Sequence, residues 1–222
     1  MGLDVDVDQV TKIITTQADI GCMFKPVDGS EAGETESDDD EDEDVFGMIT
    51  ILDMTQNTVV SNQMRSSLLD KCKRSNLTAD NKAKFASVFS GDNRVALLIN
   101  ERFIGIPPKI ALPAFECLKK ELLTKSPSFT HFLSILLISK AEPLETGQKR
   151  RHKKEDGDDN SETVFLHPEA KFLQEVSHVT FDYEVDMKLE EEELHSFRRV
   201  IVLESCDLET FVESLKNNFE NS

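Results

Sequence analysis

Five short apolar runs, separated by segments with helical periodicity, limit what this chain can fold into. Their β-branched content and short length are typical of strands. They are "VFGMITIL" at 45–52, "VALLIN" at 95–100, "FTHFLSILLIS" at 129–139, "HVTFDYEV" at 178–185 and "RRVIVL" at 198–203. Buried strands that alternate with helices favour an α/β fold. The last two runs are close in sequence, which predicts an antiparallel pair at one side of a mixed sheet.

Apolar residues at helical spacing lie between and beyond these runs. The predicted helices cover 4–16, 61–72 with Ser61 as N-cap, 78–89 with Thr78 as N-cap, a stretch from near Leu112 to 123, 167–177 with Pro168 at its first position, and 207–219 with Asp207 as cap. The sequence therefore predicts a single three-layer α/β domain over 1–222, and it contains no internal repeat.

Two polar segments interrupt this pattern and are predicted to be loops. In the segment 27–44, ten of the last fourteen residues are acidic and only Ala32 among them is apolar. Such a segment cannot pack against a core, so we expect a disordered acidic loop that binds partners. A second, charged loop is predicted over 144–162. The acids expected to contact partners are Glu34, Glu36, Asp38, Asp39, Asp40, Glu41, Asp42, Glu43 and Asp44.

The charge balance favours cationic partners. Lys and Arg number 25 against 43 Asp and Glu, which gives a net charge of -18. This field repels nucleic acids and anionic membranes and attracts basic proteins, so we expect no direct nucleic-acid or membrane partner. The four cysteines lie far apart and no apolar signal segment follows Met1, which favours a reducing compartment.

A basic run inside the second loop suggests nuclear import. The candidate import residues are Lys149, Arg150, Arg151, Lys153 and Lys154. Import receptors read such runs as extended segments, although a solvated charge run without that role remains an alternative. The acids that follow at 155–159 screen the run and weaken any binding to nucleic acid.

The motifs of catalysis and of metal binding are absent from the sequence. The five histidines have no spacing that suits a metal site, and there is no nucleophile signature. No two glycines are two positions apart, so the chain has no GxG phosphate-binding loop. We therefore expect neither an enzyme, nor a cofactor, nor a metal, and we expect the acids of 188–194 to form a solvated face.

The segment "NERFIGIPPKIALP" at 100–113 is the most distinctive in the chain. Locally it predicts the end of a strand, a rigid apolar turn and the start of a helix, with Pro113 in the first turn. It resembles the signature segment of the BCCIP family, nuclear proteins named for interacting with a breast-cancer susceptibility protein and a cyclin-dependent kinase inhibitor. The acid block that runs into a strand at 38–52 and "FLSILLISK" at 132–140 support the resemblance. The signature residues are Glu101, Arg102, Phe103, Ile104, Pro107 and Pro108.

The resemblance implies a fold similar to the GCN5-related acetyltransferases, used for binding. The cofactor loop pattern of those enzymes, [RQ]xxGx[GA], is missing here. The implied function is a non-enzymatic nuclear adaptor or chaperone that escorts a basic large-subunit ribosomal protein. Family roles extend to ribosome biogenesis, nuclear export, DNA repair and cell-cycle control, with shuttling to the cytoplasm. Alternatives are an acyltransferase with an unconventional acetyl-CoA site and a scaffold of DNA-repair assemblies.

Two further expectations follow from the resemblance. Family members carry an acidic tail, a strand and a helix before the part that matches here, so a first strand is expected to be missing and a sheet edge to be unpaired. Glu101 and Arg102 are candidates either for contacting a partner or for supporting the fold, and the sequence leaves both roles open.

Ser37 is the candidate phosphoacceptor, because acids occupy the four positions after it. Kinases with basic clefts prefer such flanks, and a phosphate there would add roughly -1.5 to -2 charges. We expect an acid-directed kinase to label the wild type and to label Ser37→Ala much less, as measured by phosphate incorporation. Equal labelling of both proteins would exclude Ser37.

Overall fold

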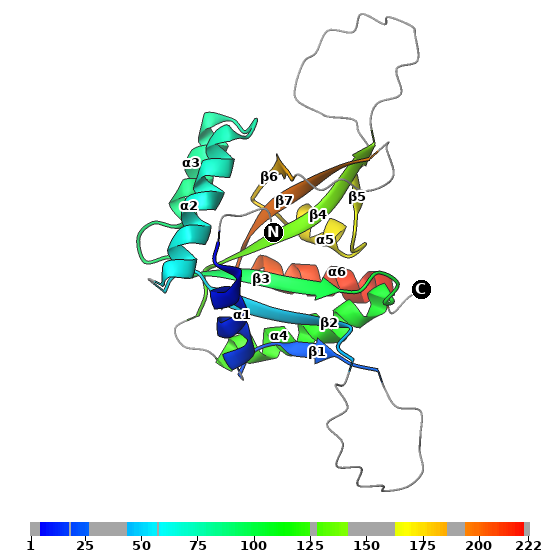
Figure 1. The fold of residues 1–222 in the computed structure, drawn as a ribbon. Coiled ribbons are helices and arrows are strands. Elements are labelled where there is room, and N and C mark those ends of the chain that lie inside the picture. Colours follow the sequence, from blue (N-terminus) through cyan, green and yellow to red (C-terminus); the bar gives the residue numbers. More distant parts are fainter. Residues whose placement is uncertain are drawn as a thin grey trace, which may run out of the picture.

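The computed structural model describes residues 5–17, 19–26, 44–56, 58–124, 128–141, 163–185 and 194–219. Within them a mixed sheet of seven strands carries helices on both faces (Figure 1). The elements are α1 Val7–Thr16, β1 Cys22–Phe24, β2 Gly47–Asp53, α2 Val59–Arg74, α3 Ala79–Val88, β3 Val95–Arg102, the 3-10 helix Pro108–Ile110, α4 Ala111–Thr124, β4 His131–Ala141, β5 Thr163–Phe165, α5 Ala170–Glu175, β6 Val179–Glu184, β7 Leu194–Glu204 and α6 Asp207–Phe219.

The strands follow the order β1-β2-β3-β4-β7-β6, and β5 also pairs with β4. The pair of β3 and β4 is parallel, whereas the other pairs are antiparallel. The predicted mixed sheet and the predicted antiparallel pair, here β6 with β7, are therefore confirmed. Strands β1 and β5 were not predicted, because three residues are too few to show a period of two.

The sheet splits between β3 and β4. Their pairing runs from Val95 opposite His131 to Leu98 opposite Ser134 and then ends. Beyond that point β3 continues along β2, while β4 continues along β7 and takes β5 on its other side. The final residues of β3 therefore lack a parallel neighbour, and this split positions the candidate site.

Two apolar cores lie on the two faces of the sheet. Helices α4, α5 and α6 contribute to one core, where the rings of Phe115 and Phe211 are 4.7 Å apart, edge to face. Helices α2 and α3 contribute to the other, where Phe85 meets Phe181 at 5.0 Å, and α1 adds Val10. The three-layer prediction is confirmed for the described residues, because apolar cores form on both faces of the sheet.

Three of the predicted helix starts are wrong. Helix α1 starts at Val7, after the N-cap Asp6, and not at residue 4. Helix α2 starts after Thr58, whose side chain accepts a hydrogen bond from the backbone N–H of Ser61, so Ser61 lies inside the helix. Burial of Val60 in the core favours the earlier start, which the cap residue alone could not indicate. Helix α5 starts at Ala170, so Pro168 lies in the turn before it rather than at the first helical position.

The predicted caps at Thr78 and Asp207 differ in outcome. Thr78 caps α3 as expected, since its side chain accepts from the N–H of Asn81. Asp207 is the first residue of α6, and its carboxylate accepts from the N–H of Glu204 instead of capping the first turn from outside. Its second partner is His178, which lies far away in sequence and anchors the start of α6 to the strand pair.

A close approach fixes Gly21 between α1 and β1. Its φ is +105°, and a Cβ added there would lie 2.4 Å from the backbone oxygen of Ile49. Gly91 also has a positive φ, of +63°, but has open space around it.

We expect Gly91→Ala to lower the free energy of unfolding by about 1–2 kcal/mol through backbone strain alone. Gly21→Ala should lower it by a further ~1–3 kcal/mol through overpacking, as measured by urea unfolding. If both variants lost the same free energy of unfolding, the close approach at Gly21 would make no contribution to stability.

Candidate functional site

The signature segment lies at the split in the sheet. Successive side chains of β3 point to opposite faces, so Arg102 points toward α5 and Glu101 points away from it. The Arg102 side chain is 2% exposed and contacts Glu169, which directly precedes α5, through both carboxylate oxygens. The distance from Arg102 Nη2 to Glu169 Oε2 is 2.8 Å. Asn100 Nδ2 donates to the same carboxylate at 3.3 Å. The structure thus places Arg102 as a support of the fold.

His167 lies beside this ion pair. Burial lowers its pKa, the Arg102 guanidinium lowers it further, and Glu169 opposes both effects. The imidazole is therefore neutral near pH 7. Its Nε2 atom and Asn100 Oδ1 have no hydrogen-bond partner among the described residues. Both residues line a cavity of about 10 Å³, which has room for about one water molecule.

The cavities that the described residues form at the split are small. The second cavity there, lined by Glu101 and Ile135 among others, measures about 20 Å³. Sites for small molecules usually measure about 300–1,000 Å³, so neither cavity in the split has room for one. Whatever binds at this site in its described form must bind on its surface.

The surface on the Glu101 side of the split is what we call the open sheet face. In the register of β1, β2 and β3, Met23, Met48 and Glu101 are direct neighbours on this face. It consists of Met23, Phe46, Met48, Glu101 and Phe103 on one side of the split, and of Ile135, Leu137 and Arg198 on the other. Figure 1 shows α1 in front of the left-hand end of β2, while no described helix lies in front of the right-hand ends of β2 and β3.

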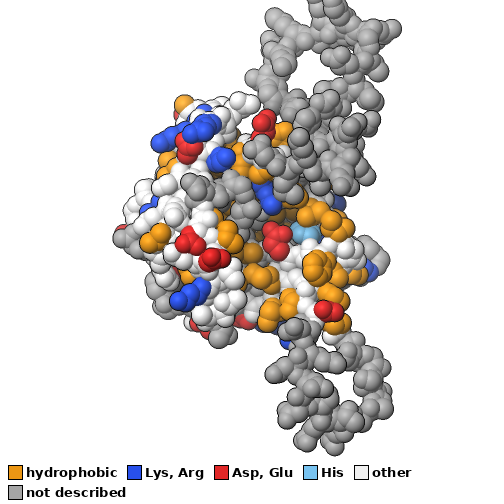
Figure 2. All heavy atoms as spheres, viewed as in Figure 1, with side chains coloured by type: hydrophobic (Ala, Val, Ile, Leu, Met, Phe, Trp, Pro, Cys, Tyr) orange, Lys and Arg blue, Asp and Glu red, His pale blue; other side chains and the backbone are white. Residues whose placement is uncertain are grey.

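The open sheet face exposes large apolar side chains. Met23 is 62% exposed and Phe103 is 64% exposed. Ile104, at the rim, is 85% exposed. In Figure 2, which has the same view, hydrophobic side chains gather at the right of this face around an acidic side chain and a histidine. Exposed apolar surface of this kind is typical of sites where proteins bind other proteins.

Glu101 is the acid of the open sheet face. Glu101 is exposed, yet partial burial raises its pKa because the surrounding strands remove part of its water, while Arg198 and the N-terminal ammonium group act to lower it. No ion pair of Glu101 is present among the described residues. The charge is incompletely compensated, so a cation placed there would be stabilised.

The turn that carries Phe103 and Ile104 is held on both sides. The backbone N–H of Phe103 donates to Phe46 O at 2.8 Å, and the two rings are 6.3 Å apart. Pro107 and Pro108 lead into the 3-10 helix and directly into α4. The hydrogen bond to Phe46 anchors the backbone at Phe103, so the exposed apolar pair is presented at a defined point of the sheet edge.

Charge is unevenly distributed along the chain. The segment 59–90, which spans α2 and α3, has six Lys or Arg against two Asp, a net charge of +4. Given the total of -18, the remaining residues together carry -22. The α2 and α3 pair is thus a basic surface on an acidic molecule, and it repels cationic partners that the rest attracts.

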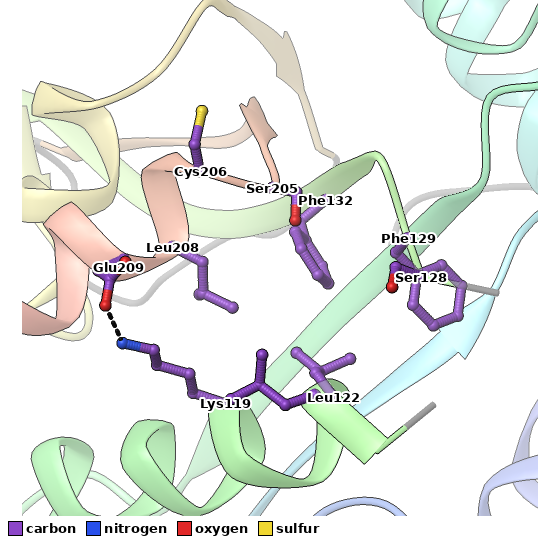
Figure 3. Close-up of a pocket in the computed structure, with 10 residues that line it drawn as sticks. Lys119, Leu122, Ser128, Phe129, Phe132, Ser205, Cys206, Leu208 and Glu209 are labelled. Carbon is purple, nitrogen blue, oxygen red and sulfur yellow. Dashed lines mark hydrogen bonds and ion pairs between the residues drawn. The ribbon is translucent and has the colours of Figure 1, made fainter. Parts of the chain in front are cut away.

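Away from the split, a larger hollow lies between the end of α4 and the start of α6 (Figure 3). It measures about 190 Å³, and Lys119 Nζ contacts Glu209 Oε1 at 2.6 Å across it. Apolar side chains form its floor, namely Leu122, Phe129, Phe132 and Leu208. The Cys206 thiol at its rim contacts the carboxylates of Glu204 and Asp207, which are poor activators of a nucleophile. This hollow offers neither chemistry nor net charge.

Several predicted residues lie outside the described part of the chain. They are Glu34, Glu36, Ser37 and the acids 38–43 of the acidic loop, and the basic run 149–154. Asp44 is described and is exposed just before β2. In the described residues, no three His, Cys, Asp or Glu side chains come together as metal ligands. No helix within the described ranges is long and apolar enough to cross a membrane.

Sequence reasoning missed Glu169, Asn100 and His167. In "HPEAKF" Glu169 looks like an ordinary residue at a helix start. The one available signal was indirect: strand β3 is apolar up to Ile99, and an Arg at its buried end requires an anion from elsewhere. Sequence alone cannot name which of the many acids supplies it.

Comparison with known proteins gives consistent matches. The family model BCCIP matches residues 2–173. The "BRCA2 and CDKN1A-interacting protein" of Bos taurus is 32% identical over 82% of this chain and 60% of its own length. The corresponding protein of Mus musculus is 29% identical over 96% of this chain and 71% of its length. "Protein BCCIP homolog" of Danio rerio is 26% identical over 95% of this chain and 73% of its own length.

These matches leave part of each relative uncovered, since the chain spans 60% of the length of the bovine protein. Among solved structures, the crystal structure of BCP1 from Saccharomyces cerevisiae is similar at 15% identity and a TM-score of 0.49. That match covers 80% of this chain and 64% of the yeast chain. At this TM-score it supports no conclusion about fold or function.

The buried ion pair should be essential for stability. Glu169→Gln leaves the Arg102 charge buried without a counter-charge, so we expect the free energy of unfolding to fall by about 3–5 kcal/mol. The exposed pair of Arg74 and Asp70 is the control, and Asp70→Asn should cost less than about 0.5 kcal/mol. Urea unfolding measures both variants. A loss for Glu169→Gln as small as the control's would mean that the pair does not hold the split together.

Proposed function

The chain belongs to the BCCIP family, and from this membership we propose that it is a non-enzymatic nuclear adaptor or chaperone that binds and escorts a basic protein. The observation that carries the proposal is the open sheet face with its rim. Phe103 and Ile104 are exposed beside an incompletely compensated carboxylate, and the two cavities that the described residues form in the split are too small for a ligand. This arrangement suits binding to a protein surface better than it suits catalysis.

The net charge supports a cationic cargo. A total of -18, with ten acids in 31–44, attracts basic polypeptides from a distance and speeds their association. Attraction of this kind is salt-sensitive and does not select among basic proteins. The apolar contacts of the open sheet face supply the shape-specific part of recognition.

The finer parts of the proposal come from the family resemblance. The cargo is a large-subunit ribosomal protein, and the roles are in ribosome biogenesis, nuclear export, DNA repair and cell-cycle control. Mammalian relatives are named for interaction with BRCA2 and CDKN1A, and we propose partners of those two classes for this chain. The basic run 149–154 directs import into the nucleus, from which the protein shuttles to the cytoplasm.

We also propose that the core is related to the GCN5-related acetyltransferases without their cofactor loop. The mixed sheet with helices on both faces is compatible with this relation. The alternative function, an acyltransferase, is favoured by no contact in the described residues. Titration with acetyl-CoA decides between the two functions, because saturable binding with a Kd of roughly 1–100 µM would favour the enzyme.

The test of the adaptor function is capture of partners from nuclear extract, read by quantitative mass spectrometry. We expect the wild type to enrich one basic protein, and the double variant Phe103→Ser with Ile104→Ser to capture at least about tenfold less of it. Val59→Ser is the matched control, because Val59 is 60% exposed on α2, far in sequence from this turn. The melting temperature of each variant must match that of the wild type.

Two outcomes would contradict the proposal. If the wild type enriches no basic protein, the adaptor function is wrong. If it captures every basic protein and loses all of them when 31–44 is neutralised, the acidic loop acts only as a charge sink and selects no cargo.

A further inference from the structure

We propose that the open sheet face is the docking surface for a cationic, partly apolar segment of the cargo, in which one Lys or Arg contacts Glu101 while apolar side chains cover Met23, Phe103 and Ile104. This inference rests on the proposed adaptor function and names the chemistry of the segment that binds.

The geometry of the face fits a short chain segment. Met23, Met48 and Glu101 form a row across three strands, and neighbours in such a row are about 4.5–5.5 Å apart at Cβ. The next row contains Phe46 and Phe103, whose rings are in contact range. Glu101 therefore ends a row whose other two members are apolar and lies beside a second row that is apolar, so a segment in which a cation adjoins apolar residues matches this order.

The charges of the face favour a cation at one position only. Glu101 has no ion-pair partner among the described residues, and Arg198 is across the split from it. Arg198 Nε is buried and has no hydrogen-bond partner in the described ranges. The positive charge of Arg198 repels a second cation on this side of the face, so the segment needs one cation, opposite Glu101.

The two other surfaces of note are less suitable for a cationic segment. The basic surface of α2 and α3, with its charge of +4 over 59–90, repels it. At the hollow between α4 and α6, Lys119 already neutralises Glu209, so a cation gains little there. Nucleic acid is disfavoured at the open sheet face, because Arg198 is the one basic residue in it and the molecule around it is acidic.

Methionine methyl NMR observes this face directly. Met23 and Met48 belong to the open sheet face, whereas Met54 and Met64 are fully buried in the core and serve as internal controls. The probe is a short synthetic peptide in which lysine alternates with leucine. The matched peptide has glutamine at every lysine position. We expect the lysine peptide to shift the methyl signals of Met23 and Met48 and to leave those of Met54 and Met64 in place.

Charge variants of Glu101 test the pairing itself. We expect the lysine peptide to bind the wild type at least about tenfold more tightly than the glutamine peptide. Glu101→Gln should reduce this preference by about fivefold or more, and Glu101→Lys should abolish it. Glu213→Gln and Glu213→Lys are the controls, since Glu213 is exposed on α6 and its replacement changes the net charge equally.

The outcomes separate this inference from the adaptor function. If the lysine peptide binds but the Met23 and Met48 signals stay unchanged, or if the Glu101 and Glu213 variants lose preference equally, the docking surface is wrong. Capture of a basic protein from nuclear extract would then still support the adaptor function. If no peptide binds and no basic protein is captured, both proposals fail.

Discussion

The buried pair of Arg102 and Glu169 is the interaction on which the rest of this structure depends. Between β3 and β4 the backbone hydrogen bonds stop after Leu98 and Ser134, so the ladder does not hold the final part of β3 to the other half of the sheet. The ion pair joins that part of β3 to the segment before α5, which packs against α6 and β7. Removing two charges from water is costly, and two parallel hydrogen bonds between fixed groups are the geometry that offsets this cost.

The same pair explains how one sequence motif serves two purposes. Adjacent residues of a strand point to opposite faces, so locking Arg102 inside requires Glu101 to point outward. The hydrogen bond from the Phe103 N–H to Phe46 O then anchors the chain where Phe103 and Ile104 leave the strand. Stability on one face and a presented surface on the other are therefore coupled. The sequence left both roles open for both residues, and the structure assigns the supporting role to Arg102.

Much of the fold could be predicted, because it rests on local patterns. The hydrophobic pattern predicts strands β2 and β6. The side-chain hydrogen bond of Thr78 predicts the cap of α3, and closeness in sequence predicts the pairing of β6 with β7. Strands β1 and β5 escaped prediction, since they exist only by pairing with longer strands. The start of α2 was misplaced because Ser is by type a better cap than Thr, whereas burial of Val60 favours the start after Thr58.

By itself the sequence determined the class of the fold, the family and the sign of the charge, because each is a sum or a pattern over neighbouring residues. Only the tertiary structure decided that the sheet splits after Leu98, that Glu169 is the partner of Arg102, and that Met48 lies between Met23 and Glu101. These are contacts between residues far apart in the chain. They depend on strand register and on which polar group reaches a buried charge, and neither is written in any local stretch of sequence.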